Sequence, residues 1–240
     1  MNSPRPKSEP RRWCVKRLVE GIARFQRDVF PAIEPQFQLP GGQKPRAMLI
    51  TCSDSRIEPT ILMQSSPGDL FICRNAGNIV PAYGGASGGV SATIEYAVLG
   101  LGVPNIIICG HTDCGAMGAI LNPDKVKDMP TVRSWVRYAE SARRIVEENF
   151  PDLTGEALAD TLAQENVLAQ LDNLRTHPSV AARLARGQLT LHGWVYRLHT
   201  GEVIAFDGEH HVFVPLAPGE IPNAVPHPRL ARKASDEVAV

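Results

Sequence analysis

The sequence has no excess of charge of either sign, because its 25 lysines and arginines balance its 25 aspartates and glutamates. Proteins that bind nucleic acid usually carry a strong basic excess. We therefore expect no nucleic-acid partner. The chain also lacks an apolar run long enough to span a bilayer, so we expect no membrane partner.

Cysteine is scarce, with five residues in a chain of 240. An odd count without a dense framework argues against a secreted disulfide scaffold, and a chain of this length buries a core without such staples. The first twelve residues, MNSPRPKSEPRR, are basic but lack the apolar segment of a secretory signal. We therefore expect a cytoplasmic protein whose thiols stay reduced and free to bind metal.

The pattern along the chain predicts one main domain over residues 12–216. Residues 1–11 are polar and proline-rich, which predicts a disordered lead. Residues 217–240 hold four prolines and become polar, which predicts a flexible tail. Apolar residues at helical spacing predict one amphipathic helix over residues 12–30, ended by Pro31 and Pro35; they are Trp13, Val15, Leu18, Val19, Ile22, Phe25 and Val29.

Three short apolar runs, RAMLITC, DLFICR and NIIICG, predict buried strands covered on both faces, the third over residues 105–109. A glycine-rich stretch and an apolar helix pattern connect the second run to the third. This order predicts an α/β fold, with a central, mostly parallel sheet flanked by helices. Further helices are expected near 131–148, 158–174 and 180–186, and two more strands in QLTLHGWVYRL and GEVIAFD.

Two motifs place metal-binding side chains at the ends of strands. In ITCSDSRIEP, Cys52, Asp54 and Arg56 alternate, which turns all three to one side of an extended segment. In CGHTDCG, His111 and Cys114 lie just past the third strand. If the first and third strands are neighbours, two cysteines and a histidine meet at the carboxyl edge of the sheet, where such folds place their sites. Three ligands with an open fourth position are typical of a catalytic zinc.

A plainer interpretation applies to every cysteine, since a lone cysteine at a strand end is usually a small buried hydrophobe. We expect that role for Cys73 and Cys109, which lie inside apolar runs, and Cys14 is expected to be a core or surface thiol. For Cys52 and Cys114 the surrounding residues are polar. Spacing alone supports a metal site and plain thiols about equally.

The order CSDSR followed by HTDCG resembles the β-class carbonic anhydrases, especially their cyanobacterial and plant-type branch. PGDLFICRNAGN, ATIEYAV, ENVLAQLDNL and HGWVY extend the likeness over about residues 12–216. The resemblance implies one Zn²⁺ per chain, held by Cys52, His111 and Cys114. It also implies that Asp54 and Arg56 form a catalytic pair, in which a bidentate guanidinium orients the carboxylate and keeps it ionised.

The same resemblance implies further site residues. Gln43 is expected to donate a hydrogen bond to the substrate, Phe71 and Tyr96 to line a small apolar pocket, and the backbone at Gly77 to border the zinc. In this family the site lies at a dimer interface, so some of these residues can serve the neighbouring chain. The resemblance therefore implies a homodimer or a multiple of dimers, with the N-terminal helix packed on a partner subunit.

The activity that the resemblance implies is the reversible hydration of carbon dioxide to bicarbonate and a proton. Zinc lowers the pKa of bound water to about 7, and the resulting hydroxide attacks the carbon of CO2. Two alternatives remain: a CS2 or COS hydrolase on the same scaffold, and a non-catalytic zinc-binding assembly component. Gln43 and the long match to the plant-type branch favour CO2, and the Asp54–Arg56 pair argues against a purely structural metal.

A regulatory difference is also expected. In some members bicarbonate binds a Trp, an Arg and a Tyr and favours a closed site, in which the aspartate becomes the fourth metal ligand. Arg74 and Tyr196 resemble the last two, but Leu49 stands where the tryptophan falls. The leucine side chain offers no N–H donor for an anion, and a ligand without differential affinity shifts no equilibrium. We therefore expect an open site with Asp54 paired to Arg56, and simple inhibition by bicarbonate.

Overall fold

The computed structural model describes residues 15–85, 88–219 and 222, and the chain divides into two compact units, Met1–Gly42 and Gln43–Val240. The predicted disordered lead at residues 1–11 lies outside the described residues. So does nearly all of the predicted tail at 217–240.

The described part of the first unit is helical from end to end. It comprises α1 (Val15–Arg24), a π-helical segment (Phe25–Val29), α2 (Phe30–Ile33) and a 3-10 segment (Glu34–Phe37). The prediction that Pro31 ends the helix is wrong. Pro31 lies at the start of α2, where a helix tolerates a residue without an N–H group.

An apolar stripe runs along this helical unit. Within the described residues, none of its four segments holds a buried side chain. The stripe consists of residues at helical spacing that are 39–68% exposed: Val15, Leu18, Val19, Ile22, Phe25 and Val29. Apolar side chains gathered in this way mark an interaction surface.

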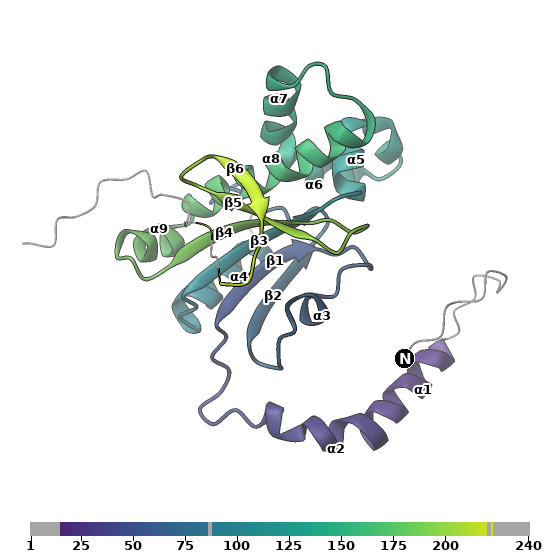
Figure 1. Ribbon diagram of the computed structural model, residues 1–240, viewed down its shortest axis with the longest axis vertical. Coiled ribbons are helices and arrows are strands. Elements are labelled where there is room, and N and C mark those ends of the chain that lie inside the picture. Colours follow the sequence, from purple (N-terminus) through teal and green to yellow (C-terminus); the bar gives the residue numbers. More distant parts are fainter. Residues whose placement is uncertain (1–14, 86–87, 220–221, 223–240) are drawn as a thin grey trace, which may run out of the picture. The chain divides into compact units, whose positions relative to one another are not determined.

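The second unit is built on a six-stranded sheet in the order β2-β1-β3-β4-β5-β6, which confirms the predicted α/β fold (Figure 1). Parallel pairing joins β1 to β2 and β3, and β3 to β4, whereas β5 and β6 are antiparallel. The strands are β1 (Ala47–Cys52), β2 (Leu70–Asn75), β3 (Asn105–His111), β4 (Thr190–Tyr196), β5 (Val203–Asp207) and β6 (Val212–Pro215). The chain passes from β2 to β3 across β1, so the strands that carry Cys52 and His111 are neighbours. The sequence analysis did not predict β6.

Helices cover the sheet and its carboxyl edge. Crossover helix α4 (Gly89–Glu95) continues as a π-helical segment, Tyr96–Gly100. Figure 1 shows α5, α6 and α7 gathered near α8 at one end of the unit. The remaining helices are α3 (Pro59–Met63), α5 (Gly115–Leu121), α6 (Pro130–Val136), α7 (Glu140–Asn149), α8 (Gly155–Arg175) and α9 (Pro178–Ala185). The helix predicted near 131–148 is divided by a 3-10 turn, Arg137–Ala139, whereas those predicted near 158–174 and 180–186 are present as α8 and α9.

The core confirms two of the three predicted buried strands. All six residues of β1 are buried, as are six of the seven in β3. Strand β2 differs, because it lies at the edge of the sheet and its Ile72 is 37% exposed. An edge strand has a neighbour on one side only, and an apolar run in the sequence does not distinguish it from a central strand.

Candidate metal centre

Three metal-binding side chains meet at the carboxyl edge of the sheet. Cys52 ends β1, His111 ends β3, and Cys114 lies immediately before α5. Their ligand atoms all lie within 4.8 Å of one another, and all three residues are buried. His111 was expected just past its strand, but it is the last residue of β3, so its backbone is held by the sheet.

The imidazole of His111 is oriented for a metal. Its Nδ1 lies 2.8 Å from the carbonyl oxygen of Thr112, and a proton on Nδ1 leaves a lone pair on Nε2. Nε2 is buried and has no hydrogen-bond partner among the residues that the structure describes. Because buried polar atoms are normally satisfied, this unpartnered nitrogen beside two sulfur atoms fits a bound metal ion.

The pKa values of the two thiols are shifted in opposite directions. The contact with Cys114 lowers the pKa of Cys52 to about 4, and His111 and a hydrogen bond from the Gly77 N–H to Sγ, at 3.3 Å, add to this effect. The same thiol contact, together with burial, raises the pKa of Cys114. One thiolate is therefore stabilised beside a protonated thiol, and a cation can take the place of that proton. Two sulfurs and one imidazole nitrogen are a donor set that suits zinc.

Asp54 and Arg56 form the bidentate pair that the sequence analysis expected. Arg56 donates from Nε to Oδ1 at 2.9 Å and from Nη2 to Oδ2 at 2.8 Å, and its backbone N–H also donates to Oδ1. The guanidinium holds the pKa of Asp54 well below its usual range. The carboxylate beside the metal group therefore stays ionised.

The sequence analysis missed Asp113. Arg56 donates from Nη1 to Asp113 Oδ2 at 2.6 Å and from Nη2 to its carbonyl oxygen at 3.0 Å. Asp113 lies between His111 and Cys114 and adopts a left-handed backbone conformation. A carboxylate between two predicted metal ligands was the available signal. Arg56 thus ties the segment after β1 to the loop between His111 and Cys114, two of the predicted ligands.

Arg74 is a second arginine beside the metal group. It donates from Nε to the carbonyl oxygen of Cys52 at 3.1 Å and from Nη2 to that of Asp54 at 2.8 Å. Leu49 is buried in an apolar cluster against which Tyr196 also packs. These contacts hold the end of β1 in place.

The predicted substrate residues separate into two groups. Gly77 touches Cys52, but Phe71 pairs with Met48, four residues before Cys52 on β1. Four residues of strand span roughly 13 Å. Tyr96 packs on Phe71 with ring centroids 5.9 Å apart, and its side chain is 52% exposed. Gln43 is exposed and lies four residues before the start of β1, whereas Cys52 is at the other end of that strand.

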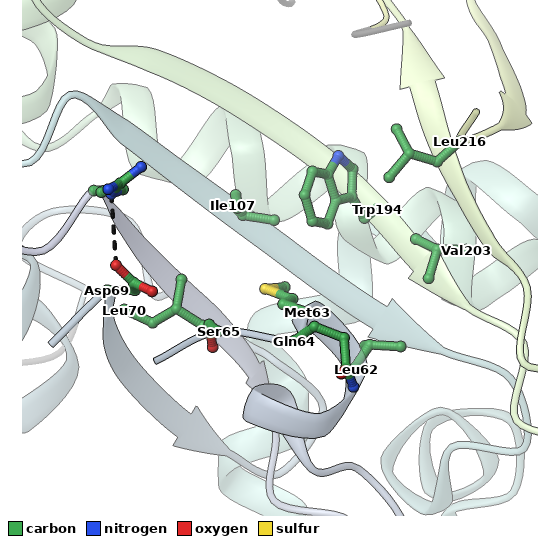
Figure 2. A pocket seen from close by; sticks show the side chains of 11 residues that line it. Leu62, Met63, Gln64, Ser65, Asp69, Leu70, Ile107, Trp194, Val203 and Leu216 are labelled. Carbon is green, nitrogen blue, oxygen red and sulfur yellow. Dashed lines mark ion pairs between the residues drawn. The ribbon is translucent and has the colours of Figure 1, made fainter. Parts of the chain in front are cut away.

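Two hollows lined by described residues of this unit can be compared. One, of about 450 Å³, borders the metal group and is polar, with Asp113, Asp160 and His199 in its wall beside Cys114. Figure 2 shows the other, of about 440 Å³, where the Arg46–Asp69 ion pair lies at 3.5 Å. None of the three metal-binding residues lines it; its wall consists of Arg46, Leu62, Met63, Gln64, Ser65, Asp69, Leu70, Ile107, Trp194, Val203 and Leu216. The first hollow therefore reaches the metal group through Cys114, and the second does not reach it.

Among the described residues, no helix combines the length and apolar character needed to cross a membrane.

Buried sulfur and nitrogen donors at the carboxyl edge of a parallel sheet, beside an ionised aspartate, define the class of metal-dependent α/β enzymes. A protein-family model for carbonic anhydrase matches residues 47–203, more than half of the chain. The chain belongs to the carbonic anhydrase family and, by its structural neighbours, to the β class, and it is an enzyme of that family.

Relatives from distant bacteria match over most of their length. A carbonic anhydrase of Synechocystis sp. is 45% identical over 89% of this chain and 81% of the relative. A carbonic anhydrase of Pseudomonas aeruginosa is 49% identical over 85% of this chain and 92% of the relative. Among solved structures, the β-carbonic anhydrase CcaA superposes with a TM-score of 0.82 at 46% identity, covering 85% of this chain and 92% of that one.

Proposed function

We propose that this protein catalyses the reversible hydration of carbon dioxide to bicarbonate and a proton, with one zinc ion per chain held by Cys52, His111 and Cys114. The observation that carries the proposal is the unpartnered, buried Nε2 of His111 within 4.8 Å of two cysteine sulfurs. Membership of the carbonic anhydrase family supports the choice of substrate.

The residues around the metal group have separate roles in this proposal. When bound, zinc supplies a Lewis acid that lowers the pKa of a coordinated water to about 7. Asp54 offers an oriented carboxylate that accepts a hydrogen bond. Because the pKa of Asp54 is held well below its usual range, the carboxylate stays ionised at neutral pH and does not take up the proton that the reaction releases. Arg56 fixes the direction of the carboxylate through two parallel hydrogen bonds.

We further propose that Phe71, Tyr96 and Gln43 serve the metal site of a neighbouring chain. Phe71 and Cys52 lie in different rows of the sheet, roughly 13 Å apart within one chain. Tyr96 is half exposed, as a residue that faces a partner requires. One solved β-carbonic anhydrase structure from Sordaria macrospora is 29% identical to this chain, with a TM-score of 0.66, and its description speaks of two tetrameric enzymes from that fungus. We propose a dimer or a multiple of dimers here, with the apolar stripe of the helical unit against a partner.

We also propose a cytoplasmic location. Support comes from Cys52, Cys73, Cys109 and Cys114, which are all free thiols. Two of these thiols must remain reduced to hold the metal, and a reducing compartment keeps them so.

Exchanging one ligand tests the function. We expect Cys114→Ser to lose zinc and CO2 hydration together, because an un-ionised hydroxyl does not replace a thiolate. Cys73→Ser, which changes a half-buried thiol in β2, is the matched control and should keep both properties. Metal analysis and stopped-flow CO2 hydration, with and without a chelator, provide the readouts.

Three results would contradict the proposal. A Cys114→Ser protein with one zinc per chain and full turnover would show that the ligand set is wrong. Hydrolysis of CS2 by the wild type without hydration of CO2 would favour the hydrolase alternative. Zinc without any activity over a broad pH range would favour a non-catalytic assembly component.

A further inference from the structure

One peptide group beside the metal centre is held at both of its ends. The peptide that joins Ala76 to Gly77 directs its N–H toward Cys52 Sγ, at 3.3 Å. The carbonyl oxygen of the same peptide accepts a hydrogen bond from Trp135 Nε1 of α6, at 2.8 Å. Because a peptide group is planar, its C=O and N–H point in opposite directions. Trp135 therefore influences where the N–H points without touching the sulfur.

We propose that Trp135 is a positioning residue of the metal centre, which aims the Gly77 N–H at the Cys52 sulfur through this shared peptide. The inference rests on the proposed zinc site and extends it to a side chain on a separate helix. A donor to the carbonyl also polarises the peptide, which strengthens its N–H as a donor. A hydrogen bond aimed at the sulfur fixes its orientation, and outer contacts of this kind tune how firmly a ligand holds its metal.

The surroundings leave the peptide little room to move. Gly77 has a φ of +82°, and a Cβ at this position would lie 2.8 Å from the Cβ of Ala116 in α5. Its own carbonyl accepts a hydrogen bond from Asn166 Nδ2 of α8, at 3.1 Å, and Asn166 is 1% exposed. The peptides before and after the Gly77 Cα are thus held by side chains of two different helices, α6 and α8.

The same region supplies a matched control. Tyr138 packs edge-on against Trp135, with ring centroids 5.7 Å apart. Its hydroxyl donates to the carbonyl oxygen of Gly85 at 2.9 Å. Tyr138 therefore makes the same kind of bond to a backbone carbonyl, but at a peptide eight residues further along the chain from Gly77. Changing either ring to phenylalanine removes one donor and keeps an aromatic side chain.

The experiment compares Trp135→Phe with Tyr138→Phe in the full-length, zinc-loaded protein. Zinc affinity is measured by competition with a chromophoric chelator, and the thiolate-to-metal charge-transfer band is recorded after cobalt substitution. We expect Trp135→Phe to weaken zinc binding about tenfold or more, as is typical for outer-shell changes, and to shift the cobalt band. We expect Tyr138→Phe to leave both readouts at their wild-type values.

Equal zinc affinity and an unchanged cobalt band in Trp135→Phe would overturn the inference, as would equal losses in the two variants. If Trp135→Phe does not fold, site-specific replacement of Trp135 by benzothienylalanine keeps the bicyclic ring, removes the N–H and carries the same expectations. A wild-type protein that binds neither zinc nor cobalt one-to-one would refute the proposed metal site itself. That outcome is distinct from a bound metal that is insensitive to Trp135.

Discussion

Arg56 illustrates how much one side chain determines at the residue scale. Its guanidinium binds the carboxylate of Asp54 and both the carboxylate and the carbonyl oxygen of Asp113. These contacts join the two loops that follow β1 and β3. A planar group with several donors in a fixed geometry is needed for this task, and lysine does not provide one.

We predict that Arg56→Lys lowers kcat/KM for CO2 hydration about tenfold or more, although the charge is retained, because the paired hydrogen bonds to Asp54 are lost. Asp113→Asn is the control, since it removes one charge from the network but keeps the Asp54–Arg56 pair. Its loss should be smaller. An unchanged rate in Arg56→Lys would contradict the role assigned to the pair.

A second prediction at this scale concerns Glu165 in α8. Burial raises the pKa of its carboxyl, with a smaller contribution from Asp172. A folded-state pKa above the unfolded value of about 4.3 means that the folded protein binds the proton more tightly. The stability contributed by this proton is present at low pH and is lost as pH rises through the folded pKa.

Glu165→Gln should therefore raise the free energy of unfolding at pH 8 and have little effect near pH 4.5. Urea unfolding at the two pH values measures the difference. Glu148→Gln, at an exposed position of α7, serves as the comparison. A gain that is the same at both pH values would contradict the titration argument.

At the scale of elements, two glycines allow α8 to approach the sheet closely. A Cβ on Gly110 of β3 would lie 2.9 Å from Val167 Cγ2, and one on Gly193 of β4 would lie 2.9 Å from Val167 Cγ1. Val167 is fully buried. Val167 of the helix thus sits over two residues without side chains, and Leu171 Cδ1 lies 3.0 Å from the same Cβ position on Gly193.

We predict that Gly193→Ala destabilises the protein by about 1–3 kcal/mol, because an added methyl overpacks this contact. Val167→Ala removes the opposing methyl groups, so the double variant should recover part of the loss. Thermal or urea unfolding of the four proteins gives the interaction energy between the two positions. Strictly additive losses would show that the two residues do not compete for the same space.

At the scale of the whole molecule, the proposed exchange of substrate residues between chains has a direct test. Cys114→Ser disables the metal site of its own chain, and Phe71→Ala disables the pocket that its chain lends to a partner. Each variant alone should be nearly inactive. In a mixed dimer, the metal site of the Phe71→Ala chain meets the intact pocket of the Cys114→Ser chain.

Co-expression of the two variants should therefore restore activity to about one quarter of the wild-type value, if dimers form at random and each mixed dimer holds one intact site. CO2 hydration is measured for the purified co-expressed proteins. Each variant expressed alone is the control. If mixed dimers are shown to be present and activity is still not restored, Phe71 belongs to the site of its own chain.

The sequence by itself determined the α/β fold and the composition of the metal site. Apolar runs predict buried strands because a parallel sheet excludes water from both faces. The carboxyl ends of neighbouring strands meet at one edge, so Cys52 and His111 could be placed together before any coordinates were known. The strands and the edge at which they meet follow from the local pattern of burial, which is written directly in the residue order. The pairing of Asp54 with Arg56 was also predicted, but not for the right reason. The extended segment ends at Cys52, and a turn at Ser55 and Arg56, closed by a hydrogen bond from the Ile57 N–H to the Asp54 carbonyl oxygen, brings the two side chains together.

Only the tertiary structure decided which distant side chains support the site. Arg56 and Asp113 are 57 residues apart, and Trp135 and Ala76 are 59 apart. No local pattern pairs them, because such contacts depend on how helices and loops pack across the finished sheet. The edge position of β2, the additional strand β6 and the separation of Phe71 from Cys52 arise in the same way. Strand order and register determine them, and both are set by packing over the whole chain rather than by any short segment.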